Sequence, residues 1–220
     1  RLSIHDLLSA YSDRSLTPLE VTQAYLARIA DLDPILHAYI TVTGETARAD
    51  AAAATRRVSA GAPRGALDGI PLGLKDVFDV AGVPTTGASR VYAAQPAKED
   101  AVAVARLRSA GAIFLGKHTL HELAAGGPSD GRWFPAARNP WDLSRLPGGS
   151  SSGSACAVVA GLCAGAFGTD TGGSVRWPAS YCGIVGFKPT YDAIPRTGVI
   201  PLSRTLDHCG PLTRTPAAAR

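Results

Sequence analysis

The sequence predicts an α/β protein with a mixed central β-sheet flanked by helices. Two observations support this fold class. Helix-like and strand-like segments follow each other in the order helix, strand, helix, strand. Only 18% of the 220 residues are charged, while 24 are glycine and 16 are proline, which indicates turns and closely packed backbone more than long charged helices. With 45% apolar residues the chain can bury a sizeable core, and we treat residues 1–220 as one domain.

The first expected helix has a well-defined start. Thr17 and Glu20 have the spacing of a capping box, and Pro18 stands at the first helical position. Apolar residues follow at helical spacing until Pro34, where the pattern ends. A second helix, rich in alanine, is expected over residues 46–59.

Two strands and a further helix are expected in the middle of the chain. Residues 70–74 form a short apolar run, which predicts a buried strand leading into Lys75. Residues 100–110 predict a helix that stops at Gly111, and residues 112–115 predict the strand that follows it.

Charge and composition argue against binding to nucleic acid or membrane. The formal net charge is +4, but the basic residues are scattered, without the dense basic stripe and interleaved aromatics of a nucleic-acid surface. The longest apolar run, over residues 155–167, is too short to cross a bilayer. We therefore expect this segment to contact neither nucleic acid nor membrane.

The cysteines indicate a reducing compartment. Four are present, and none lies in a C-x-x-C pair or at a zinc-site spacing with histidine. Cys156 and Cys163 fall in a run of small apolar residues, where a free thiol acts as a small hydrophobic group. Because no signal-peptide pattern follows Arg1 either, we expect a cytoplasmic protein without a structural metal.

A cluster rich in glycine and serine occupies residues 148–154. Such a composition can be a flexible linker. However, the cluster runs directly into residues 155–161, which are small and apolar and predict a buried helix. The N-terminus of that helix would present unpaired N–H groups beside Ser150. A second glycine-rich turn, residues 168–174, ends in Ser174.

The second turn predicts a backbone that can hold an anion. It lacks the lysine of a Walker A loop and differs from the G-x-S-x-G nucleophile elbow. Glycine permits sharp turns, so successive N–H groups can converge on one point beside the Ser174 hydroxyl. Converging N–H donors next to a serine are what an oxyanion hole requires.

A serine hydroxyl needs a base before it becomes a good nucleophile. None of the five histidines lies in a turn that resembles a catalytic motif. His118 and His121 are spaced like a metal-binding pair, yet no third ligand stands out, so a packed or surface position is favoured. Lys75 ends an apolar strand, where burial lowers the pKa of a lysine and makes it a suitable base. The alternative is a lysine that extends to solvent from the strand end.

Taken together, the sequence resembles the amidase signature family. The likeness extends over residues 5–215, and its serine motifs are long and ordered. It is carried by the segments 69–76, 138–142, 148–154, 168–178 and 182–190. The resemblance implies the amidase signature fold without its C-terminal part, because family members are much longer than this chain.

The resemblance also implies a role for each residue of these motifs. Ser174 is expected to be the acylated nucleophile and Lys75 the base. Ser150 is expected to bridge them, reached through a cis peptide bond after Gly149. The backbone N–H groups expected in the oxyanion hole are those of Thr171, Gly172, Gly173 and Ser174. Supporting roles are expected for the Asp170–Arg176 pair and for the hydroxyls of Ser151 and Ser152.

Trp177 directly follows Arg176 in the same motif. A side chain of this size could narrow the acyl pocket beside the nucleophile. Packing into the hydrophobic core is the favoured interpretation, because large aromatic residues are mostly buried.

The activity implied is hydrolysis of the amide C–N bond of a small molecule, through an acyl-enzyme on Ser174 with Ser150 and Lys75 as proton relay. No metal or organic cofactor is expected. One alternative is the glutaminase A subunit of a glutamine-dependent aminoacyl-tRNA amidotransferase, and another is an inactive fragment or binding module. The unusual segment 126–134 favours the hydrolase. A homodimer is left open.

Overall fold

The structure of the chain, a computed structural model, describes residues 2–92, 95–127 and 133–219. Its strands are β1 (Tyr39–Val42), β2 (Pro71–Lys75), β3 (Ile113–His118), β4 (Gly165–Asp170), β5 (Val185–Gly186) and β6 (His208–Thr213). Its helices are α1 (Ile4–Ser12), α2 (Pro18–Leu36), α3 (Gly44–Ser59), α4 (Val102–Ser109), α5 (Ser152–Ala160), α6 (Arg176–Cys182) and α7 (Pro216–Ala219). A 3-10 turn, η1 (Glu122–Ala124), follows β3.

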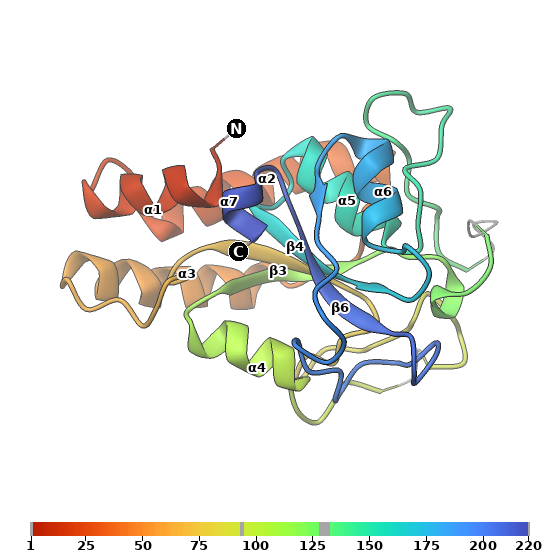
Figure 1. The fold of residues 1–220 in the computed structure, drawn as a ribbon. Coiled ribbons are helices and arrows are strands. Elements are labelled where there is room, and N and C mark those ends of the chain that lie inside the picture. Colours follow the sequence, from red (N-terminus) through yellow and green to blue (C-terminus); the bar gives the residue numbers. More distant parts are fainter. Residues whose placement is uncertain (1, 93–94, 128–132, 220) are drawn as a thin grey trace.

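The strands form one mixed sheet in the order β1-β3-β2-β4-β6-β5 (Figure 1). Strands β3, β2 and β4 are parallel, while β1, β6 and β5 pair in antiparallel fashion with their neighbours. Lys75 pairs with His118, so the carboxyl ends of β2 and β3 meet at one edge, where β4 ends at Asp170. In open α/β sheets, ligands bind at this edge. The predicted fold class is confirmed.

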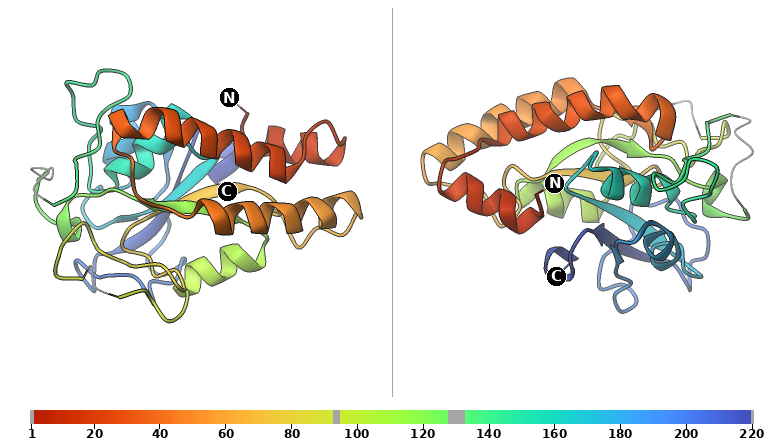
Figure 2. Two further views of the ribbon diagram at one scale, coloured as in Figure 1. Left: turned by 180° about the vertical axis from the view of Figure 1, so that it is seen from behind. Right: turned by 90° about the horizontal axis from the view of Figure 1, so that it is seen from above.

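Helices cover both faces of the sheet. Successive residues of a strand point to opposite faces, and β3 shows this alternation. Ile113 and Leu115 pack into a core cluster with α2, α3 and α5, whereas Phe114 packs into a second cluster with Val104 of α4. In Figure 1, α4 accordingly lies on the other side of the sheet from α5. Helices α2 and α3 lie side by side (Figure 2).

Helix α2 begins as expected but ends later. The Thr17 and Glu20 side chains each accept the other's backbone N–H, which confirms the capping box. The helix continues past Pro34 to Leu36. Pro34 stands in the last turn, where its missing N–H removes only one hydrogen bond. The left-handed residue His37 then ends the helix.

The other expected elements are found within a few residues of their predicted limits. They are α3, β2, α4 and β3. One prediction was wrong, because residues 168–170 belong to β4 and only the residues after Asp170 form the turn. Glycine and threonine in this segment pair with β6, so cross-strand hydrogen bonding overrides their preference for turns.

Helix α5 carries the serine cluster into the core. All nine of its residues are buried. A Cβ atom on Gly153 would lie 2.4 Å from the Ala38 carbonyl oxygen, so only glycine permits this close approach of helix and backbone. Helix α7 packs against α1, and both termini therefore lie near the same part of the molecule (Figure 1). Within the described ranges, no helix combines the length and apolarity that spanning a bilayer requires.

Candidate active site

Lys75 lies at the end of β2 and is fully enclosed, with an exposed fraction of 0%. Its Nζ donates one hydrogen bond of 2.7 Å to Ser150 Oγ and another of 2.7 Å to Thr169 Oγ1. Burial lowers the pKa of Lys75 to about 7, and the charges of Asp207 and Asp170 oppose that change. A large fraction of Lys75 is therefore neutral near neutral pH, as a general base has to be.

Ser150 is held in the tight turn before α5 and is 3% exposed. The Gly149–Ser150 peptide bond is cis, as the family resemblance implied. The Ser150 carbonyl accepts the N–H of His121 over 3.1 Å. The His121 ring also packs against this turn, because a Cβ atom on Gly149 would lie 2.2 Å from that ring. Backbone and ring contacts together fix the position of the Ser150 hydroxyl.

Ser174 lies in the turn between β4 and α6 and is only partly buried, so a substrate can reach it. Its carbonyl accepts the N–H of Ser151 over 3.2 Å, which brings the two serine turns together. The structure thus forms the link between Lys75 and Ser150. The Ser174 hydroxyl makes no hydrogen bond to any described residue, so the link from Ser150 to Ser174 is not closed. Catalytic hydrogen bonds are often open without substrate and shorten when it binds.

The Asp170 carboxylate organises the turn that carries Ser174. It is fully buried and accepts the backbone N–H groups of Gly173, Val175 and Arg176 over 2.9, 3.1 and 3.3 Å. The Arg176 guanidinium adds two bonds of 3.0 and 2.9 Å. Burial acts to raise the pKa of Asp170, but the bonds from Arg176 and the backbone outweigh it, and the pKa lies below its ordinary value. The carboxylate therefore stays charged and holds the turn in shape.

The turn leaves some of its N–H groups free. The Gly173 N–H already donates to Asp170, which separates it from the other donors expected in the oxyanion hole. The N–H groups of Thr171 and Gly172 have no acceptor among the described residues. A Cβ atom on Gly172 would meet nothing within 4 Å, so open space lies beside it. Gly173 has φ +130°, a conformation that requires glycine.

The two supporting serines differ in their contacts. Ser151 Oγ donates to the Thr169 carbonyl over 3.2 Å, which ties the start of α5 to β4. Ser152 is buried in the first turn of α5, and its hydroxyl has no hydrogen-bond partner among the described residues. Ser151 thus connects the two serine motifs by a hydrogen bond, whereas the Ser152 hydroxyl bonds to none of the described residues.

Three residues of the site were not predicted from the sequence. Thr169 accepts the second Lys75 hydrogen bond, Asp207 accepts the Thr171 hydroxyl over 2.5 Å, and His121 packs on Gly149. The alternation of a strand could have revealed Thr169, because it places Thr169 on the same side of the chain as Thr171, the first residue after β4. Nothing near Asp207 in the sequence points to the site.

Trp177 is not a core residue, so the favoured interpretation of it was wrong. It is 46% exposed and meets Tyr181 edge-to-face, with 5.7 Å between ring centres. Helix α6 turns this face outward, because Pro178 and Ala179 occupy its buried side.

The two histidines of β3 and its following turn are both buried. His118 packs against Tyr39 with ring centres 4.5 Å apart, and burial lowers the pKa of His118 to about 3. His118 Nδ1 lies 3.2 Å from Ser154 Oγ. Across the described ranges, no group of three metal-ligating side chains occurs.

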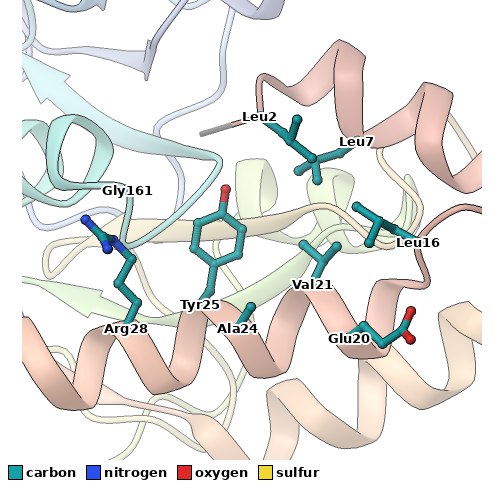
Figure 3. A pocket seen from close by; sticks show the side chains of 9 residues that line it. All are labelled: Leu2, Leu7, Leu16, Glu20, Val21, Ala24, Tyr25, Arg28 and Gly161. Carbon is teal, nitrogen blue, oxygen red and sulfur yellow. The ribbon is translucent and has the colours of Figure 1, made fainter.

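Of two cavities in the structure, one borders the candidate site and the other does not. A cavity of about 350 Å³ is lined by Thr169, Asp207 and His208, among others, and so borders the relay. A larger cavity of about 520 Å³ lies between α1 and α2, where Leu7, Val21 and other apolar side chains face it (Figure 3). None of the predicted site residues lines the larger cavity.

Similar proteins are found both by sequence and by structure. The family model described as Amidase matches residues 20–219. The A subunit of the glutamyl-tRNA(Gln) amidotransferase from Geobacter metallireducens is 48% identical over 215 residues. That match covers 97% of this chain and 44% of the relative.

Solved structures share the fold closely. The native peptide amidase of Stenotrophomonas maltophilia has a TM-score of 0.93 and 41% identity, over 100% of this chain and 46% of that chain. A structure described as a vestigial protein complex that reveals the evolutionary origins of an s-triazine catabolic enzyme has a TM-score of 0.96 and 36% identity. This match covers 99% of this chain and 48% of that chain. The chain thus spans less than half the length of these relatives.

Proposed function

Because the chain belongs to the amidase family, we propose that it cleaves an amide C–N bond through an acyl-enzyme on Ser174. Ser150 and Lys75 carry the proton between nucleophile and leaving group. One observation supports this above all others. The Lys75 amine is fully buried, its pKa is lowered to about 7, and it lies 2.7 Å from Ser150 Oγ. A lysine with only a structural role would extend to solvent or pair with a carboxylate, as the buried Lys117 does with Asp76 over 2.7 Å, whereas the hydrogen bonds of Lys75 go to two hydroxyls.

The reaction begins with two proton transfers. The lone pair of neutral Lys75 accepts the Ser150 proton across the 2.7 Å contact. Ser150 accepts the Ser174 proton in the same step, after the unbonded Ser174 hydroxyl rotates toward it. Ser174 Oγ then attacks the carbonyl carbon, and the carbonyl oxygen becomes an oxyanion.

Backbone N–H groups stabilise this oxyanion. The donors are those of Thr171, Gly172 and Ser174, because Asp170 occupies the Gly173 N–H. The Asp170 bonds hold the turn before substrate arrives, so little reorganisation is needed at the moment of attack. Such preorganised donors are worth about 3–4 kcal/mol each in related chemistry.

The C–N bond breaks once its nitrogen receives a proton. Ser150 donates that proton and takes one back from Lys75, which returns to its neutral form. The amine leaves, and an ester to Ser174 Oγ remains. Water or a second amine then attacks the ester, gives its proton to the same relay, and frees Ser174.

Labelling with a fluorophosphonate, followed by intact-mass measurement, tests the nucleophile. We expect one adduct, which is lost in Ser174→Ala and kept in Ser180→Ala, an exposed serine of α6. The labelling rate should rise with pH through an apparent pKa of about 7, because only neutral Lys75 accepts a proton. An adduct at another residue, or none on the folded protein, contradicts the proposal.

A second candidate concerns the amide that is cleaved. The segment 126–134 favoured a stand-alone hydrolase, but its residues 128–132 lie outside the described ranges. The relative from Geobacter metallireducens is named as the A subunit of an amidotransferase and is 48% identical. This identity favours glutamine as the amide and a multi-subunit complex as the setting. In that case the whole protein would release ammonia from glutamine for transfer to aminoacyl-tRNA.

Ammonia release by the full-length protein separates the two candidates. The protein is assayed with glutamine and with a small aryl amide, alone and with partner subunits and tRNA. An amidotransferase subunit should turn over glutamine faster when partners and tRNA are added. Turnover of the aryl amide by the protein alone, with no response to partners, would favour the hydrolase instead.

A further inference from the structure

Asp207 directly precedes β6, and its side chain bonds to Thr171, the residue that directly follows β4. Asp207 is 7% exposed. Its Oδ1 accepts the Thr171 hydroxyl over 2.5 Å, and its Oδ2 accepts the N–H groups of Leu202 and Ser203 over 2.9 and 3.0 Å. One buried carboxylate therefore holds both the first residue of the nucleophile turn and its own loop, residues 202–207.

The sheet explains why these groups meet. Strands β4 and β6 are antiparallel, and Asp170 pairs with His208 at the end of the ladder. The next residue along each strand is Thr171 on one and Asp207 on the other. Their side chains meet just beyond the last paired residues, at the carboxyl edge where Lys75 ends β2.

The charge on Asp207 has no direct counter-ion. Its three partners are neutral donors, and no described lysine, arginine or histidine forms an ion pair with it. The nearby Arg196 is already occupied, because its guanidinium donates to Asp192 Oδ1 and to the Arg204 carbonyl. Among the described residues, the Asp207 carboxylate is therefore held by neutral donors alone.

Thr169 lies between Asp207 and Lys75, because it lines the same cavity as Asp207 and its hydroxyl accepts a hydrogen bond of 2.7 Å from Lys75 Nζ. Burial lowers the pKa of Lys75, and the charges of Asp207 and then Asp170 oppose that change. The pKa of His121 is lowered by burial and then by the Lys75 charge. The remaining charged or titratable groups around Asp207 line the cavity of about 350 Å³, and they are Asp192, Arg196, Arg204, His208 and Cys209.

We infer that Asp207 is a positioning residue of the relay: it anchors Thr171 at the proposed oxyanion site and places an uncompensated negative charge toward Lys75. This inference rests on the proposed function for its catalytic meaning. The anchoring and the charge are two separate effects, and two substitutions can separate them. Thr171→Val removes the hydrogen bond and keeps the charge, whereas Asp207→Asn removes the charge.

Titration of Lys75 by NMR tests the charge effect without any need for activity. The chain has four lysines, at 75, 98, 117 and 188, so lysine labelled with ¹³C at Cε gives few signals. The signal that disappears in Lys75→Met belongs to Lys75. We expect Asp207→Asn to lower the midpoint of that signal by about half a pH unit or more. Thr171→Val and the control Asp13→Asn, which removes a charge at the exposed end of α1, should leave the midpoint unchanged.

The rate of Ser174 labelling by a fluorophosphonate tests the anchoring. Thr171→Val should slow labelling roughly tenfold with no change in its apparent pKa. Asp207→Asn should both slow labelling and move its rise to lower pH. Asp13→Asn should behave as the wild type, because Asp13 is exposed at the end of α1 and does not line the cavity that Asp207 lines.

Two outcomes overturn the inference. One is a Lys75 midpoint that Asp207→Asn leaves in place, and the other is full labelling speed in Thr171→Val. If Asp207→Asn does not fold, Asp207→Glu replaces it and should slow labelling while keeping the Lys75 midpoint. Wild-type labelling speed in Asp207→Glu would then overturn the anchoring role. Failure of the proposed function looks different, because the wild type itself would not label on Ser174 while its Lys75 still titrates.

Discussion

The Nζ atom of Lys75 and the Oγ atom of Ser150 lie 2.7 Å apart, and both residues are buried. A lysine is normally charged at neutral pH, and a charge in such a place is costly. Burial therefore favours the neutral amine, which is the form that can take a proton. The location of Lys75 in the fold, more than the residue type, makes it a base.

Lys75→Met should stabilise the protein most at low pH. In the folded state Lys75 releases its proton near pH 7, whereas the ordinary pKa of a lysine, and so of the unfolded chain, is 10.5. Between these values the unfolded chain binds more protons, so the free energy of unfolding of the wild type rises with pH. Below this window the wild type buries a charge that Lys75→Met does not carry.

Urea unfolding of both proteins measures this effect. The stability gained by Lys75→Met at about pH 6 should exceed that at about pH 9 by on the order of 2–3 kcal/mol. Lys98→Met serves as the control, since Lys98 lies in a loop outside the site. A difference that does not vary with pH would mean that Lys75 keeps an ordinary pKa in the folded protein.

Thr169→Val should impair the relay while keeping the fold. The Thr169 hydroxyl accepts one of the two Lys75 hydrogen bonds, and valine of similar shape cannot replace it. An N–H of Lys75 would then be buried without a partner, at a cost of about 1–3 kcal/mol. We expect Ser174 labelling to slow about tenfold or more, while Thr169→Ser stays near the wild type. Equal rates in all three proteins would show that Thr169 does not support Lys75.

Asp170→Asn and Arg176→Lys should differ sharply in stability. Asp170 is fully buried and accepts three backbone N–H groups, so an amide in its place leaves donors unpaired. We expect a loss of about 2–4 kcal/mol in the free energy of unfolding. The Arg176 side chain is 52% exposed, and Arg176→Lys should cost less than about 1 kcal/mol. Similar losses would mean that the ion pair, and not the backbone bonds, holds the turn.

Two glycines of the serine motifs form a matched pair for a steric test. A Cβ atom on Gly149 would lie 2.2 Å from the His121 ring, whereas one on Gly172 would meet nothing within 4 Å. Neither glycine has a positive φ, so alanine is not strained by conformation alone. Gly149→Ala should therefore destabilise the protein by about 1–3 kcal/mol, and Gly172→Ala by less than about 0.5 kcal/mol.

Thermal unfolding of the two alanine variants is the simplest measurement. Gly149→Ala combined with His121→Ala extends the test, because removal of the ring opens the space that the new methyl group needs. The double variant should recover part of the loss seen in Gly149→Ala. If it recovers nothing, the His121 ring is not what excludes a side chain at position 149.

Much of the local structure could be predicted from short stretches of sequence. The Thr17 capping box depends on groups three residues apart, and the strand before Lys75 depends on one apolar run. The small-residue helix after Ser150 was predicted by composition alone and is buried over all nine residues. The exposed position of Trp177 was not predictable in this way, because it depends on which side of α6 faces the core.

The sequence by itself determined the chemical groups of the candidate site and the turns that present them: two serines in glycine-rich turns and a lysine at the end of an apolar strand. Only the tertiary structure decided which distant groups meet. Parallel pairing of β2 and β4 places Thr169 beside Lys75, and antiparallel pairing of β4 and β6 places Asp207 beside Thr171. The physical reason is that contacts between strands depend on their order and register in the sheet, and no single segment of the chain contains that information.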